Sequence, residues 1–226
     1  MKLFSSLAII FLLPSLVFAH GGSVDAKGGH TNKKTGEYHC HKKACYSMPK
    51  RPMINTSRAP KYNRDEWKHW SDLDFDCMNT RHEILKDQAD KTKPETIKLS
   101  PDGCYISMAT WHDPFSGKTY TRASDLDVDH IIPLKWAHDH GGYSWDRVKK
   151  EEFANDPINL LAVDDGLNQS KGAQGPTEWM PPNHAFRCEY LSKWQRVLKK
   201  YKALKMTPGE KRIFGRQLRA CQEPRK

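Results

Sequence analysis

The sequence has a single long apolar run and no internal repeat. The run covers residues 3–18, follows Lys2 and leads to a small-residue cleavage site at Ala19. It is too short, and too close to that site, to predict a transmembrane anchor, and no cysteine follows it to accept a lipid. We therefore expect residues 1–19 to be a signal peptide. The mature protein, beginning at His20, should be periplasmic or extracellular with no membrane anchor.

Large aliphatic residues are scarce between residues 20 and 61. This stretch is rich in glycine, histidine and lysine, so it cannot bury a core of its own. We expect it to form an N-terminal module and a linker. Its nitrogen and sulfur ligands would suit a structural zinc ion (Zn2+), and a small Cys40–Cys45 disulfide on a flexible arm is the equal alternative. The candidate zinc ligands are His30, His39, Cys40, His41 and Cys45.

The six cysteines form an even set, which in an exported chain predicts disulfide bonds. Apolar residues recur at helical spacing over residues 190–204, and residues 207–210 (Thr-Pro-Gly-Glu) form a capping box. Two antiparallel helices would bring Cys188, at the start of the first, beside Cys221, at the end of the second. The favoured pairs are Cys188–Cys221 and, by elimination, Cys77–Cys104.

Acidic residues are too few to balance the basic ones. The chain carries 37 Lys and Arg against 27 Asp and Glu, a formal net charge of +10 that falls to +9 when Lys2 leaves with the signal. An exported protein of this charge should attract polyanions, of which nucleic acid is the obvious one. Residues 62–226 suffice for one catalytic domain of ordinary size. Its tryptophans are better explained as core residues than as residues that stack on nucleobases.

The most informative segment is residues 127–133, Asp-Val-Asp-His-Ile-Ile-Pro. A carboxylate, Asp129, directly precedes a proton acceptor, His130, and phosphodiester hydrolysis needs both a metal ligand and a base. A second apolar run, suited to a strand, ends at Leu161, and residues 165–168 can open a short helix with Asp165 as its cap. The order strand, strand, helix is therefore predicted around this pair.

These motifs resemble those of the His-Asn-His (HNH) endonucleases. The resemblance implies an α+β fold with a ββα-metal hairpin-plus-helix core embedded in a mainly helical domain. It implies a catalytic group of His130, the general base, and Asn159, which supports the histidine through backbone hydrogen bonds. Asp129 and Asn168 would hold the metal. Because the last position is Asn and not His, we expect Mg2+ or Mn2+.

The resemblance extends from about residue 65 to residue 221 and is to the branch at the carboxyl end of GmrSD-like restriction enzymes, a type also seen in secreted bacterial proteins. It implies an exported bacterial member of that branch. It implies the nuclease core alone. The landmarks are Asp76-Cys77-Met78-Asn79-Thr80-Arg81 with Glu83 and Leu85, Asp113-Pro114-Phe115-Ser116-Gly117-Lys118, and Glu178-Trp179-Met180-Pro181-Pro182 with Cys188 and Tyr190.

Other polar residues near the motif have two interpretations each. Lys171 and Arg122 are candidates for phosphate contacts, with ordinary surface cations as the alternative. Asp127 shares a strand face with Asp129 and is either a second ligand or an outer partner, the latter favoured. His138 and His140 either reach a metal or lie in a solvent loop, the latter favoured.

The sequence thus predicts an exported, metal-dependent endonuclease with little sequence specificity. DNA is the expected substrate and RNA the alternative, and no protein partner is predicted. The rival hypothesis is a non-catalytic exported protein that binds metal and nucleic acid without cutting. The intact Asp129-His130 pair argues against it, because a pure binder has no use for the base.

Overall fold

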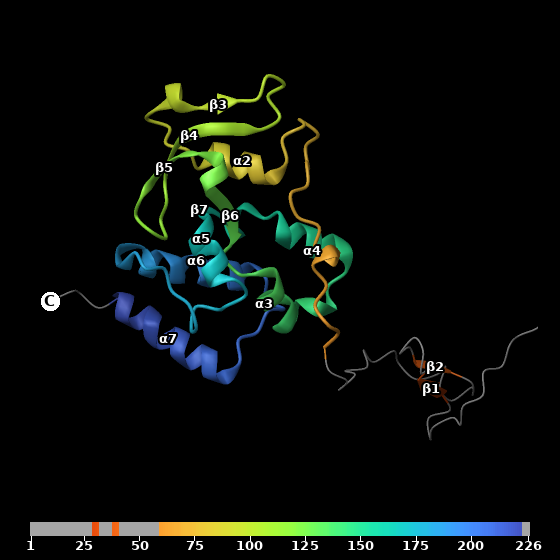
Figure 1. The fold of residues 1–226 in the computed structure, drawn as a ribbon. Coiled ribbons are helices and arrows are strands. Elements are labelled where there is room, and N and C mark those ends of the chain that lie inside the picture. Colours follow the sequence, from red (N-terminus) through yellow and green to blue (C-terminus); the bar gives the residue numbers. More distant parts are fainter. Residues whose placement is uncertain (1–28, 32–37, 41–58, 223–226) are drawn as a thin grey trace, which may run out of the picture. The chain divides into compact units, whose positions relative to one another are not determined.

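The computed structural model describes residues 29–31, 38–40 and 59–222 (Figure 1). The chain divides into two compact units, residues 1–57 and 58–226. In the first, β1 (Gly29–Thr31) pairs antiparallel with β2 (Tyr38–Cys40), which sets His30 opposite His39. His41, Cys45 and the predicted signal peptide lie outside the described residues, so the zinc site and the Cys40–Cys45 bond stay predictions.

The second unit is a mixture of helices and small antiparallel sheets, and the predicted α+β class is confirmed. None of the helices that the structure describes is long and apolar enough to cross a membrane. The elements are α2 (Thr80–Asp87), β3 (Lys98–Leu99), β4 (Ile106–His112), β5 (Thr119–Arg122), β6 (Leu126–His130), α3 (Leu134–Asp139), α4 (Arg147–Ala154), β7 (Leu160–Asp164), α5 (Asp165–Lys171), α6 (Arg187–Lys200) and α7 (Pro208–Gln222).

The hairpin of β6 and β7 lies between two hydrophobic clusters. Its strands pair antiparallel, with Asp129 opposite Leu161 and His130 opposite Leu160. Side chains alternate between the faces of a strand. Val128 accordingly packs with the β4 and α2 cluster, while Val163 packs with the cluster that includes α6. Figure 1 shows this hairpin between the β3–β4–β5 sheet at one end and α6 and α7 at the other.

A short helix follows the hairpin directly. The side chain of Asp164 accepts a hydrogen bond from the Leu167 amide and so caps the start of α5. The helix ends at Gly172, whose φ of 52° suits a residue without a Cβ. The predicted order of strand, strand and helix is therefore present, although the cap is Asp164 and not Asp165.

Two disulfides close the ends of the domain, and both are the predicted pairs. Cys188, near the start of α6, is bonded to Cys221 near the end of α7, and the capping box between Thr207 and Glu210 is formed. Cys77, just before α2, is bonded to Cys104, just before β4. Each disulfide links two cysteines that are distant along the chain. It reduces the conformational freedom of the unfolded chain and so stabilises the folded state.

Candidate functional site

Asp129 is held at the end of β6 by a buried lysine. Its carboxylate is 4% exposed, and its Oδ1 accepts a hydrogen bond from the Lys171 Nζ at 2.8 Å. The other oxygen, Oδ2, is buried and has no hydrogen-bond partner among the described residues. Burial raises the pKa of Asp129 to about 6, although the neighbouring ammonium opposes that shift. One carboxylate oxygen is thus anchored and the other is available to a ligand.

His130 is a neutral base with a fixed tautomer. Its Nε2 lies 2.8 Å from the carbonyl oxygen of Ala154, which can only accept, so Nε2 carries the proton and Nδ1 bears the lone pair. Burial lowers the pKa of His130 to about 3, and the positive charges of Lys171 and Arg64 add to that shift. The ring is therefore unprotonated at neutral pH, as a general base must be.

Asn159 ties the two ends of the hairpin together. It is fully buried; its Oδ1 accepts from the Ile132 amide at 2.8 Å, and its Nδ2 donates to the Ile132 carbonyl at 3.3 Å. Its own carbonyl accepts from the Ile131 amide at 2.8 Å. All three bonds fix the backbone immediately after His130, and all of them are made away from the metal-ligand candidates.

Asn168 and Asp127 form a second contact between α5 and β6. The Asn168 Nδ2 donates to the Asp127 Oδ2 at 3.0 Å, which leaves the Asn168 Oδ1 without a partner among the described residues. Asn168 and Lys171 are three residues apart and so share a helix face. Because they contact Asp127 and Asp129 respectively, the Asn168 Oδ1 and the Asp129 Oδ2 belong to the same junction of helix and strand.

Lys171 is placed differently from both sequence-based alternatives, whereas Arg122 lies where the surface-cation alternative puts it. Lys171 is fully buried, and its ammonium bonds Asp129 and the His130 carbonyl, the latter at 2.9 Å. It is neither a surface cation nor positioned to meet a phosphate. Arg122 is exposed on β5 and pairs with Asp125 at 3.6 Å. No hydrogen bond or ion pair within residues 59–222 links Arg122 to the Asp129 junction.

The prediction that His138 and His140 lie in a solvent loop was wrong. Both belong to the end of α3. His138 is 1% exposed, and its Nε2 donates to the Pro60 carbonyl at 2.6 Å. His140 stacks on Trp136 at 3.6 Å between ring centroids and bonds Glu210 at 3.1 Å. Each imidazole thus has an internal partner, while the buried Nδ1 of His138 has no hydrogen-bond partner among the described residues.

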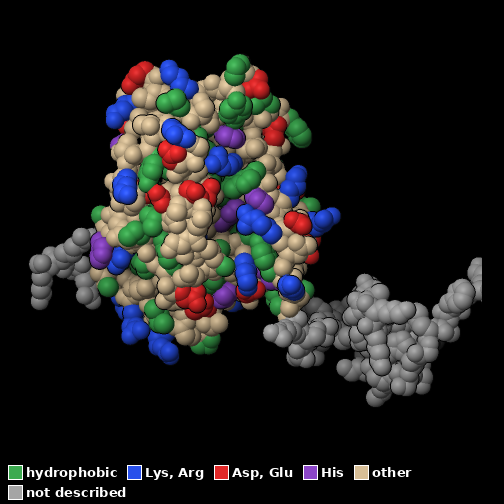
Figure 2. Space-filling model, in the orientation of Figure 1, with side chains coloured by type: hydrophobic (Ala, Val, Ile, Leu, Met, Phe, Trp, Pro, Cys, Tyr) green, Lys and Arg blue, Asp and Glu red, His purple; other side chains and the backbone are tan. Residues whose placement is uncertain are grey.

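Sequence reasoning missed two aromatic residues that contact the base. Trp70 stacks on His130 with ring centroids 5.5 Å apart and planes 28° apart, and His69 meets the same ring edge-on at 6.3 Å. They lie sixty residues before His130 along the chain, and no motif of the sequence connects them. Figure 2 shows acidic, basic and histidine side chains meeting near the middle of one face, between the two ends of the domain.

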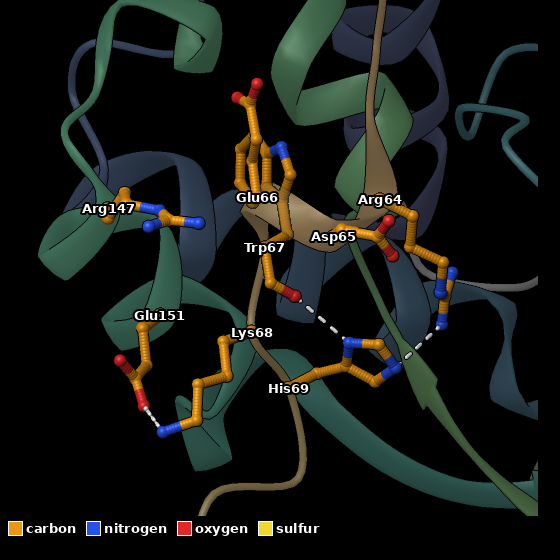
Figure 3. A pocket seen from close by; sticks show the side chains of 8 residues that line it. All are labelled: Arg64, Asp65, Glu66, Trp67, Lys68, His69, Arg147 and Glu151. Carbon is orange, nitrogen blue, oxygen red and sulfur yellow. Dashed lines mark hydrogen bonds and ion pairs between the residues drawn. The ribbon is translucent and has the colours of Figure 1, made fainter.

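A pocket of about 660 Å3 opens beside these aromatic residues. Figure 3 shows His69 and Arg64 together on one side of it, with the Lys68–Glu151 ion pair and Arg147 on the other. The pocket does not include Asp129 or His130 among its lining residues. It is therefore a neighbour of the Asp129–His130 site and not the site itself.

Three aspartates of an exposed loop also approach one another. Ligand oxygens of Asp72, Asp74 and Asp76 lie within 4.8 Å of one another. With Glu83 at the twelfth position, the spacing is that of an EF-hand calcium loop in which Cys77 replaces the usual glycine. Exposed carboxylates often lie this close without an ion, so we assign no metal to this loop.

Comparison with known proteins identifies the family. Residues 79–213 match the model of the C-terminal domain of GmrSD restriction endonucleases, which is more than half of the chain. The chain belongs to this family. The Asp129–His130 hairpin and the Asn168–Lys171 helix both lie inside the matched segment, whereas His69 and Trp70 precede it. The predicted kinship to the GmrSD-like branch is thereby confirmed, and a nuclease-like function follows from it.

A curated relative agrees with export. A protein described as an uncharacterized secreted protein, from Arthroderma benhamiae, is 37% identical over 163 residues, which are 71% of this chain and 76% of the relative. Because that relative is fungal, the bacterial source expected from the sequence stays a prediction. No solved structure matches the chain.

Proposed function

We propose that this member of the GmrSD C-terminal family is an exported HNH-type endonuclease with a ββα-metal core, cutting DNA, or RNA as the alternative, with little sequence specificity. One observation carries the proposal. A buried, unpartnered carboxylate oxygen of Asp129 lies next to a histidine whose tautomer is fixed and whose free nitrogen is unprotonated. Such a pair suits hydrolysis, and a buried unpartnered polar atom beside a group of perturbed pKa is typical of functional sites.

The residues at this junction fit a divalent metal ion. The Asp129 Oδ2 is orphaned and buried, and an orphaned carboxylate oxygen is stabilised by a cation. The hydrogen bond from the Asn168 Nδ2 to Asp127 orients the amide, so that its Oδ1 has no protein partner among the described residues. Oxygen donors of this kind favour Mg2+ or Mn2+ over softer metals. We infer that Asp129 and Asn168 hold the ion, with Asp127 as the outer partner that orients Asn168.

The chain's own residues would then divide the reaction between them. A bound divalent ion supplies stabilisation of the charge that develops on the phosphate. His130 accepts the proton of the attacking water at Nδ1, while its Nε2–H stays on the Ala154 carbonyl and prevents the ring from turning. Lys171 keeps Asp129 ionised and anchored, and Asn159 keeps the backbone after His130 in place.

Plasmid nicking by the purified, oxidised mature chain tests this function. We expect cutting with Mg2+ or Mn2+, none with EDTA, and a loss of roughly 100-fold to 10,000-fold in rate in His130→Ala, which is the range for a missing general base. His184→Ala is the matched control because His184 is exposed at the start of a separate turn. Thermal unfolding checks that both variants fold.

The outcomes separate this proposal from its rival. Metal-dependent nicking that His130→Ala abolishes and His184→Ala retains supports the enzyme. DNA binding without any nicking by the wild type would replace the proposal with the non-catalytic binder. Equal nicking by both variants would place the base elsewhere.

A further inference from the structure

The residues before the family-matched segment form one wall of the proposed active site. Trp70 stacks on the His130 ring and His69 meets it edge-on, and both precede residue 79, where the family match begins. Trp70 also has a φ of 61°, a left-handed conformation that is strained for a bulky residue. The chain therefore accepts backbone strain at the position that sets both rings against the base.

His69 has a defined tautomer and holds an arginine. Its Nδ1 donates to the Trp67 carbonyl at 3.0 Å, because a carbonyl can only accept. Its Nε2 is then the acceptor for the Arg64 Nη2 at 3.3 Å (Figure 3). The neutral imidazole thus orients the guanidinium without neutralising it, and the positive charge of Arg64 acts on His130.

The charges of the neighbouring pocket leave Arg64 free for an external anion. Lys68 pairs with Glu151 at 2.8 Å, and Glu66 pairs with Lys150 at 2.5 Å. The remaining charged groups of the lining make no ion pair within residues 59–222. They are Arg64, Arg147 and Asp65, and they leave a surplus of one positive charge.

We propose that Arg64, oriented by His69, binds a phosphate of the nucleic-acid substrate beside His130, so that residues 62–70 supply the phosphate contact of the active site. Guanidinium matches phosphate geometry with two parallel hydrogen bonds, which an ammonium cannot do. Arg64 contacts the substrate, whereas His69 is a positioning residue that acts through Arg64. This inference rests on the proposed function. It assigns to Arg64 the phosphate contact that Lys171 cannot make, because Lys171 is fully buried.

The test measures binding in a background that cannot cut. The full mature chain carrying His130→Ala binds a fluorescent 20-base-pair DNA duplex in EDTA, and its dissociation constant is followed against salt concentration. We expect Arg64→Ala to weaken binding by about ten-fold and to reduce the slope of log affinity against log salt by about one, as for the loss of one phosphate contact. Arg212→Ala, which removes an exposed charge from α7, is the matched control.

Two further variants test the role of His69. His69→Leu removes the acceptor for Arg64 and should weaken binding nearly as much as Arg64→Ala, whereas His69→Gln retains an acceptor oxygen and should restore part of the affinity. Arg64→Lys keeps the charge but loses the paired hydrogen bonds. Its affinity for DNA should therefore lie between that of the chain with Arg64 intact and that of Arg64→Ala.

The result that overturns the inference is an equal change in Arg64→Ala and Arg212→Ala, or no change in either. The first would mean that Arg64 adds only general charge. The proposed function fails separately: a wild-type chain that never nicks plasmid, yet loses DNA binding in Arg64→Ala, would refute the enzyme and retain the phosphate contact.

Discussion

The two sides of the β6–β7 hairpin support their functional residues by opposite means. On the α5 side, Asp129 is held by a buried ammonium and stays ionised because of it. On the side of residues 67–70, His130 is held by stacked rings and one carbonyl, and stays neutral because burial disfavours its charge. Adjacent residues of one strand thus become a charged carboxylate and an uncharged imidazole, and the difference comes from their neighbours.

Removing the Lys171 ammonium should have the largest effect on the stability of the domain. Lys171→Met leaves Asp129 buried without a partner, and breaking a buried pair in this way typically costs about 3–5 kcal/mol. Urea unfolding at pH 7 in EDTA measures the loss. Lys135→Met is the matched control, because it removes an exposed pair with Asp139 that should be worth under about 1 kcal/mol. Equal losses would show that the buried pair has no special role.

The contribution of the neutral His130 to stability can be isolated by measuring how the free energy of unfolding depends on pH. The folded pKa of His130, about 3, lies below its ordinary value of 6.5, so below pH 6.5 the unfolded chain binds the extra proton and the free energy of unfolding falls as pH falls. Between pH 6.5 and pH 5 the wild type should lose about 2 kcal/mol from this source. His130→Gln can still donate a hydrogen bond to the Ala154 carbonyl, but it has no titrating ring. Its loss of stability over the same pH range should therefore be smaller than that of the wild type by this amount.

Asp129 contributes to pH dependence with the opposite sign. Its pKa is raised from 3.8 to about 6, so its contribution to stability falls as pH rises from about 4 to 6. The wild-type curve therefore contains both terms, and the difference between the wild type and His130→Gln isolates the histidine. A difference that does not change between pH 6.5 and pH 5 would contradict the neutral, buried base.

The smallest predicted effect tests the orientation of Asn168. Asp127→Asn removes the carboxylate that accepts from the Asn168 amide, so the amide can turn and offer either nitrogen or oxygen to the metal. We expect the metal concentration for half-maximal nicking to rise by about ten-fold, the lower end of the range for outer partners of metal ligands. An unchanged requirement, with folding confirmed, would mean that Asp127 does not orient the ligand.

The sequence predicted those parts of the site that are local along the chain. The β6 strand and the short helix after β7 follow from short periodic patterns and turn residues. The second strand was expected to end at Leu161, whereas β7 begins at Leu160 and ends at Asp164. Asn159 was identified by the family resemblance and not by a pattern. The Cys188–Cys221 bond also followed from local patterns, because two adjacent helices of similar length must return the chain to its starting point.

Features that depend on packing between distant segments could not be predicted. Lys171 carries no sign of burial in its own sequence neighbourhood, and its burial results from an acidic residue 42 positions earlier. His138 was wrongly assigned to solvent because its partner, the Pro60 carbonyl, is 78 residues away. The contact of Trp70 with His130 likewise joins segments that only the tertiary fold brings together.

The bonds of Asn159 also protect the pairing of the hairpin against slippage. A shift of β6 by one residue would exchange the faces of Asp129 and His130 and so put the base where the ligand should be. Asn159 binds both the amide and the carbonyl of Ile132, and it does so in complete burial. In a shifted hairpin both polar ends of its amide would be buried without partners. Asn159 therefore disfavours a shifted register and helps to keep Asp129 and His130 on the faces that they occupy.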